Sequence, residues 1–299
     1  MTSDVAPSTV PGIARALRER ERGENFPVAL AVLPRRHREA LHAVYAYART
    51  VDELGDAAIG DRVAQLRALE ARLPATWDGA RIDDPVLDDL QRTVVARGVD
   101  QQPFRDLIAA NLQDQRVNRY RSLDELRDYC RLSADPVGRI VLQVFGAATA
   151  ANVELSDRVC TALQLLEHWQ DVAEDRCAGR IYLPGEDLDR YGVAETDLDL
   201  PSATPQLASM MRFEIERAAR LLESGAPLVR ELRGWARPCV AGFVAGGRAT
   251  VAALRRTHGD VLATAARPSR PGTAARLVGL LARSALATTV TDDSGEAHR

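Results

Sequence analysis

Three carboxylates recur at four-residue intervals in the segment 164–175. They are Glu167, Asp171 and Asp175, and Gln164 lies one turn earlier in the same register. Residues four apart share one face of an α-helix and are about 6 Å apart along its axis. Most of the remaining surface is apolar, and like charges at this spacing repel one another and are unfavourable to bury unpaired. The pattern indicates either a bound cation along the row or, as for most runs of charge, a solvated acidic face.

A second segment carries a comparable stripe of polar residues. Tyr45, Arg49, Asp52 and Asp56 follow one another at helical spacing, among neighbours that are small or apolar. Carboxylate oxygens suit Mg²⁺, which keeps several waters and commonly binds substrate phosphates as well. Two such helices facing each other across Mg²⁺ would hold a diphosphate. Arg49, one turn before Asp52, is placed to contact the same phosphates.

Further motifs accompany these two in a characteristic order. They are Glu-Asn-Phe-Pro at 24–27, Tyr-Cys-Arg-Leu-Ser-Ala-Asp-Pro-Val-Gly at 129–138 and Gly-Arg-Ile-Tyr-Leu-Pro at 179–184. With the two acidic segments, they make the chain from about residue 24 to 256 resemble the squalene/phytoene synthase family, whose members carry two aspartate-rich motifs on facing helices. Glu-Asn-Phe-Pro, His-Trp-Gln-Asp-Val and Phe-Val-Ala-Gly-Gly-Arg at 243–248 are most similar to the hydroxysqualene synthase branch of hopanoid biosynthesis.

The resemblance implies a fold and a reaction. The fold would be an all-α, single-domain isoprenoid-synthase-type helical bundle around a central cavity. The reaction would be Mg²⁺-dependent ionisation of presqualene diphosphate, followed by rearrangement and capture by water to give hydroxysqualene and diphosphate. The alternatives are a head-to-head condensing enzyme that makes presqualene diphosphate, squalene or phytoene, and a non-catalytic relative that acts as a binding or assembly protein. A helical di-metal oxidase is disfavoured because its Glu-x-x-His pairs are missing.

The resemblance also implies roles for individual residues. Tyr129 falls where the family has an aromatic residue near the reacting carbons, and with four of the aspartates it forms the expected catalytic set. The expected metal ligands are Asp52, Asp56, Glu167, Asp171 and Asp175. The expected substrate contacts are Asn25, Phe26, Tyr45, Arg49, Gln164, Arg180 and Tyr182. Glu167 stands where many relatives have Asn, so it is either a metal ligand or a partner of a metal-bound water.

Composition narrows the remaining possibilities. The 299 residues are 46% hydrophobic with a net charge of −3, which permits a large core and gives no nucleic-acid-binding signature. The four cysteines form no C-x-x-C pair, which favours a reducing compartment. Neither a signal peptide nor a run of about 20 apolar residues is visible. We expect a cytoplasmic protein, with peripheral contact at the inner membrane face and contact with other hopanoid-pathway enzymes as further expectations.

Helical periodicity predicts the organisation of the chain. We expect helices at 35–59, 61–73, 101–117, 122–151 with a break near 135–136, 157–177, 206–224 and 227–258. The family resemblance implies that segment 179–184 closes over the site, and the Asp, Gly and Pro content of 185–205 indicates a long connection. Asp84 before Pro85 reads as a helix N-cap, so the acidic run 83–89 is not a third metal motif. A catalytic domain at 11–289 would lie between disordered ends, 1–10 and 290–299, and residues 273–289 would form a terminal packing or membrane-surface helix.

Overall fold

The computed structural model describes residues 33–79, 81–263 and 266, and this part of the chain is helical without any β-strand. The helices from residue 35 to residue 144 are α3 (Arg35–Asp56), α4 (Arg62–Arg72), α5 (Pro85–Arg97), α6 (Gln102–Asp114), α7 (Leu123–Ser133) and α8 (Asp135–Val144). The helices from residue 150 onward are α9 (Ala150–Gln170), α10 (Val172–Cys177), α11 (Gly185–Tyr191), α12 (Pro205–Gly225), α13 (Leu228–Glu231) and α14 (Ala236–Arg256). Two 3₁₀ turns lie at Leu73–Thr76 and Glu195–Asp199. The predicted all-α fold is confirmed.

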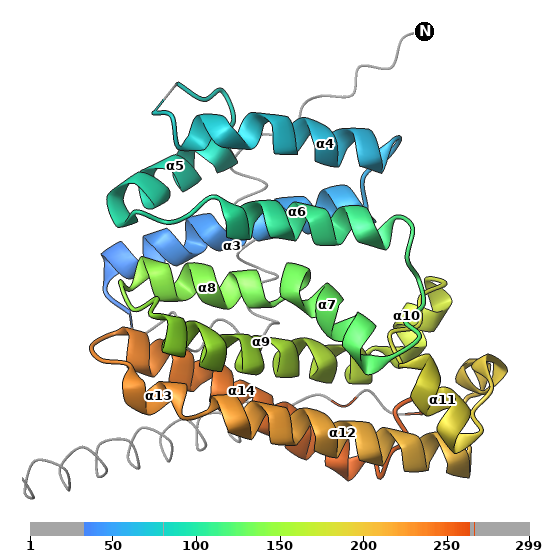
Figure 1. Ribbon diagram of the computed structural model, residues 1–299. Coiled ribbons are helices and arrows are strands. Elements are labelled where there is room, and N and C mark those ends of the chain that lie inside the picture. The colour runs from blue at the N-terminus through green and yellow to red at the C-terminus, as the bar shows by residue number, and fades with distance from the viewer. Residues whose placement is uncertain (1–32, 80, 264–265, 267–299) are drawn as a thin grey trace, which may run out of the picture.

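The helices stack in layers around two apolar clusters. In Figure 1, α4 and α5 lie above α3 and α6, the consecutive helices α8 and α7 form the next layer, and α9 lies between this layer and α12. Helix α14 packs against α9 and α12, and its Cys239 also reaches the apolar cluster of α3 and α8. One cluster joins α7, α9, α12 and α14 around Trp169, and the other joins α3, α5, α6 and α8 around Tyr47 and Phe104. The phenol of Tyr47 donates to the Phe104 carbonyl oxygen at 2.9 Å, which satisfies its polar group inside the core.

Local sequence signals explain several helix ends. The Asp84 side chain accepts hydrogen bonds from the backbone N–H groups of Val86 and Leu87 at the start of α5. Asp88 and Asp89 on the next turn both pair with Arg92. The acidic run at 83–89 therefore serves capping and surface pairing, as its sequence predicts.

The structure corrects several predicted boundaries. The second acidic helix begins at Ala150, because Thr149 caps it through the Asn152 N–H, and it is interrupted at Asp171, where φ is −105° and ψ is 16°. The helix before it ends at Val144, ahead of Gly146 with φ +66°. The break predicted near 135–136 is confirmed at Ala134.

Two C-terminal predictions also need correction. The predicted connection 185–205 contains α11 and a 3₁₀ turn, and the predicted helix 227–258 is split into α13 and α14. The split falls in segment 232–235, where Gly234 has a φ of +54° that is unfavourable for residues with a side chain. None of the described helices is long and apolar enough to cross a membrane.

Small residues on α8 serve helix packing. A Cβ atom added to Gly138 would lie 2.4 Å from Ser156 Oγ and 2.5 Å from Cys160 Sγ, both on α9. The absence of a side chain at Gly138 therefore leaves room for these two atoms of α9. At Gly138 the structure supports close approach. The predictions for Asn25, Phe26, the terminal segments and residues 273–289 fall outside the described residues.

Candidate active site

The predicted metal ligands lie at the solvent-accessible ends of their helices. Asp52 and Asp56 occupy the last two turns of α3, Asp171 lies at the junction of α9 with α10, and Asp175 is on α10. The Asp56 side chain is 54% exposed and that of Asp175 is 23% exposed. Glu167 is also exposed. The carboxylates are thus half-buried or exposed, and water and partial pairing offset the repulsion within each row at a lower cost than burial.

The loop after α10 contacts the end of α3. Arg180 Nη2 lies 2.6 Å from Asp56 Oδ1. Burial lowers the pKa of Arg180, but Asp56 and Tyr182 together outweigh burial, so the pKa is raised. Backbone hydrogen bonds from Ile181 N to Asn118 O and from Gly185 N to Tyr120 O, both 2.9 Å, hold the loop along segment 118–121. Arg180 was predicted to contact phosphate, and in this structure it pairs with a predicted metal ligand.

Tyr182 of this loop packs with two further tyrosines and with Asp114. Tyr129 Oη on α7 donates to Asp114 Oδ2 at 2.7 Å, and Tyr182 Oη in the loop donates to Asp114 Oδ1 at 3.4 Å. The rings of Tyr120, Tyr129 and Tyr182 lie 5.5–5.7 Å apart, centroid to centroid. Burial raises the pKa of Asp114 to about 6, although both hydroxyls and Arg180 favour its ionised form. Burial also raises the pKa of Tyr182 to about 12.

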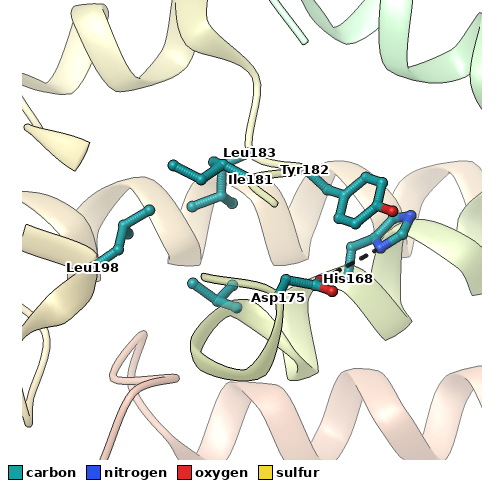
Figure 2. A pocket seen from close by; sticks show the side chains of 7 residues that line it. His168, Asp175, Ile181, Tyr182, Leu183 and Leu198 are labelled. Carbon is teal, nitrogen blue, oxygen red and sulfur yellow. Dashed lines mark ion pairs between the residues drawn. The ribbon is translucent and has the colours of Figure 1, made fainter. Parts of the chain in front are cut away.

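His168 connects this cluster to the second acidic segment. Its ring stacks on Tyr182 with centroids 3.8 Å apart and planes 13° from parallel. Its Nδ1 lies 3.8 Å from Asp175 Oδ2 (Figure 2). Its Nε2 lies 3.2 Å from Gln164 Nε2. Burial lowers the pKa of His168, and the neighbouring Asp175 opposes that change. The predicted substrate contact Gln164 therefore lies against an imidazole in this structure.

A small pocket opens beside these residues. Its empty volume is about 190 Å³ when the open solvent at its mouth is included, and it is lined largely by apolar side chains. Figure 2 shows how the pocket lies between the loop, α9, α10 and the following 3₁₀ turn. The lining residues are His168, Val172, Asp175, Ile181, Tyr182, Leu183 and Leu198.

These contacts bring the two acidic segments to one end of the bundle. Asp56 pairs with Arg180, Tyr182 two residues later stacks on His168, and His168 faces Asp175. The chain of contacts is continuous from α3 to α10, although the helices are separated by more than 100 residues in the sequence. Two rows of carboxylates at one end, with Arg180 between them, can bind an anion through cations.

The remaining predicted residues on α3 lie along the same helix. Asn111 Nδ2 on α6 donates to Asp52 Oδ1 at 3.3 Å. Arg49 Nε lies 3.7 Å from Glu53 Oε1, one turn along α3. Tyr45 lies two turns before Asp52 and is partly buried. Both α3 and α6 thus contribute polar groups to the site.

Sequence reasoning missed Asp114 and His168. Asp114 lies seven residues after Leu107 and so continues the apolar face of α6, a position where a carboxylate is unusual. His168 shares a helical face with Gln164 and Asp175, at spacings of four and seven residues. Both signals were present in the chain, but neither specified a partner.

The donor set fits Mg²⁺ better than a metal with an all-protein cage. Within the described residues, no group of three or more His, Cys, Asp and Glu side chains is close enough to hold a metal ion. Mg²⁺ is typically held by one or two carboxylates together with waters and substrate phosphates. Carboxylates in pairs on separate helices, partly exposed, match that requirement.

Comparisons with known proteins agree with the fold. The sequence profile described as squalene/phytoene synthase matches residues 19–273. A hydroxysqualene synthase from Rhodopseudomonas palustris is 36% identical over 215 residues, 72% of this chain and 73% of that protein. A phytoene synthase from Mycobacterium bovis is 32% identical over 242 residues, 79% of each. The crystal structure of squalene synthase HpnC from Alicyclobacillus acidocaldarius gives a TM-score of 0.76 at 37% identity, covering 85% of this chain and 97% of that one. The chain therefore belongs to the squalene/phytoene synthase family.

Proposed function

We propose that this protein is an enzyme of isoprenoid biosynthesis that ionises presqualene diphosphate in the presence of Mg²⁺ and forms hydroxysqualene. The observation that carries the proposal is the contact chain from Asp56 through Arg180, Tyr182 and His168 to Asp175, which gathers two acidic segments at one end of the bundle. Similarity to a hydroxysqualene synthase over 72% of the chain supports the choice of product.

The chain's own charged residues bind and orient the diphosphate in this proposal. Asp52 and Asp56 on one side, with Asp171 and Asp175 on the other, would hold Mg²⁺, and Glu167 would bind the metal or one of its waters. When bound, Mg²⁺ stabilises negative charge on the departing diphosphate. Arg180 and Arg49 provide further positive charge at the same end, which favours a bond-breaking step that places charge on the leaving oxygens.

Aromatic side chains stabilise the hydrocarbon part of the reaction. The C–O bond breaks with its electron pair going to diphosphate, the cyclopropylcarbinyl cation rearranges, and a water oxygen captures the cation and loses a proton. Tyr129 is buried beside the acidic end, so its ring would stabilise positive charge where little water enters. The ring faces of the neighbouring Tyr182 are covered by Tyr120 and His168. The remaining predicted substrate contacts are Asn25, Phe26, Tyr45, Gln164 and Tyr182.

A condensing activity is the second candidate. The similarity to a phytoene synthase over 79% of the chain supports this alternative, in which two prenyl diphosphates are joined head to head. Both activities begin with ionisation of a prenyl diphosphate, so the same carboxylates serve either one. A non-catalytic role would instead leave the acidic segments without a substrate. Contact with an inner membrane face or with other pathway enzymes belongs to the proposal as well.

One incubation experiment separates these candidates. Purified protein is given presqualene diphosphate, farnesyl diphosphate or geranylgeranyl diphosphate with Mg²⁺ and without a reductant, and the lipid product is identified by mass spectrometry. Hydroxysqualene from presqualene diphosphate supports the proposal, whereas presqualene diphosphate or phytoene from simpler prenyl diphosphates supports condensation. Failure to release diphosphate from any prenyl substrate would support a non-catalytic role. The Asp171→Asn variant is the control for product formed at this site.

A further inference from the structure

The carboxylate of Asp114 lies where three separate parts of the chain meet. It ends α6, and it accepts hydrogen bonds from Tyr129 on α7 and from Tyr182 in the loop 179–184. Each hydroxyl uses a different carboxylate oxygen. Because each phenol has one proton, both protons are committed to Asp114, and each phenol oxygen can act towards other groups only as an acceptor.

The position of Arg180 depends on the same loop. Tyr182 follows Arg180 by two residues, and its ring is fixed between Tyr120 at 5.7 Å and His168 at 3.8 Å. The loop backbone is held on segment 118–121, and Asp114 holds the loop through a side chain. A loop anchored by both its backbone and Tyr182 keeps the Arg180 guanidinium at Asp56.

Asp114 is an unfavourable choice for a purely structural role. Its pKa of about 6 lies above the ordinary 3.8 because burial disfavours the charged form more than its partners favour it. Between these two values the folded protein binds more protons than the unfolded chain, so the free energy of unfolding falls as the pH rises through this interval. At neutral pH the ionised Asp114 therefore lowers stability, as is common for groups retained for activity. Tyr129, Tyr182, Tyr120, Arg180 and Asp56 are the titratable or charged groups that act on it.

We propose that Asp114 is a positioning residue, which holds the hydroxyls of Tyr129 and Tyr182 and thereby keeps the loop 179–184, with Arg180, against the end of α3. Its effect on turnover rests on the proposed function, whereas its effect on the loop does not. Asp114 acts through the two tyrosines and is separate from the predicted metal ligands.

Hydrogen exchange tests the effect on the loop. The Ile181 amide donates to Asn118 O, so its exchange rate reports detachment of the loop from segment 118–121. In Asp114→Asn and in Tyr182→Phe we expect this amide to exchange about threefold faster, as for the loss of one modest hydrogen bond. The double variant should exchange no faster than either single variant, because both remove the same contact. Asp106→Asn is the matched control on α6, since Asp106 bonds Gln102 and should leave the loop unchanged.

Stability and turnover complete the test. Asp114→Asn should keep or raise Tm at pH 7.5, while the rate of diphosphate release from a prenyl diphosphate falls about tenfold. The proposal is overturned if exchange at Ile181 is unchanged in Asp114→Asn. It is also overturned if that variant has a lower Tm at pH 7.5 with faster exchange throughout α6 and α7, which would indicate general structural support. If wild-type protein releases no diphosphate, the proposed function fails, and the exchange rates still decide the role of Asp114.

Discussion

Arg180 and Asp56, which are 124 residues apart, form an ion pair with 2.6 Å between nitrogen and oxygen. This pair joins the loop after the second acidic segment to the last turn of the first. Arg180 thereby places a positive charge beside the first acidic row, Asp52 and Asp56, which reduces the repulsion between these carboxylates. A divalent ion that binds Asp56 must compete with Arg180, so the pair links metal binding to the position of the loop.

Replacing Arg180 with Gln should affect binding more than stability. The ion pair is partly exposed, with Asp56 at 54%, so its loss should change the free energy of unfolding by no more than about 1 kcal/mol. The loss of positive charge should raise KM for the diphosphate substrate and raise the affinity of the free protein for Mg²⁺, measured by calorimetry. Arg67→Gln, which removes a surface pair with Glu70, is the charge-matched control. An unchanged Mg²⁺ affinity in Arg180→Gln would contradict the competition.

Neutralising a predicted metal ligand should abolish turnover without unfolding the protein. Asp52→Asn and Asp171→Asn should each lower the rate of diphosphate release by at least about 100-fold, the scale expected when a charge-stabilising group is lost at such a site. Thermal unfolding should shift little, because both side chains are partly exposed. Asp88→Asn in the acidic run 83–89 is the control and should be active. Near-native rates in Asp52→Asn or Asp171→Asn would show that the metal assignment is wrong.

The lowered pKa of His168 predicts that the protein becomes less stable at acidic pH. Burial lowers its pKa below the ordinary 6.5, so the unfolded chain binds more protons than the folded protein as the pH falls through that region. The free energy of unfolding therefore decreases below about pH 6.5 through this residue. His168→Phe keeps a ring against Tyr182 and removes the titration. Its Tm measured from pH 5 to 8 should fall less on the acid side than that of the wild type, and identical profiles would rule out this contribution.

Replacing Gly138 with a larger residue should disturb the packing of α8 against α9. In Gly138→Ala the new Cβ would lie 2.4 Å from Ser156 Oγ and 2.5 Å from Cys160 Sγ, so α8 and α9 must move apart or their side chains must shift. Overpacking of this kind costs about 1–3 kcal/mol. Denaturant unfolding should show a lower midpoint with the same slope. Ser156→Ala in the same background should recover part of the loss, because it removes one of the two clashing atoms.

The sequence by itself determined the class of fold and the location of the two acidic segments that carry the candidate ligands. Helical spacing identified both acidic segments, and the N-cap at Asp84 separated a structural acidic run from the candidate ligands. These features depend on residues within a few turns of one another. The order of the motifs indicated the squalene/phytoene synthase family, and the match of the family profile to residues 19–273 confirms it.

Only the tertiary structure decided which side chains meet. Asp114 and His168 lie on amphipathic helices that carry several other polar residues, and nothing local pairs them with Tyr129, Tyr182 or Asp175. Those pairings arise because the packing of α6, α7 and α9 brings the ends of distant segments to one end of the bundle. The balance of burial and long-range partners, which sets the pKa of Asp114 and places Arg180 on Asp56, has no counterpart in the sequence pattern.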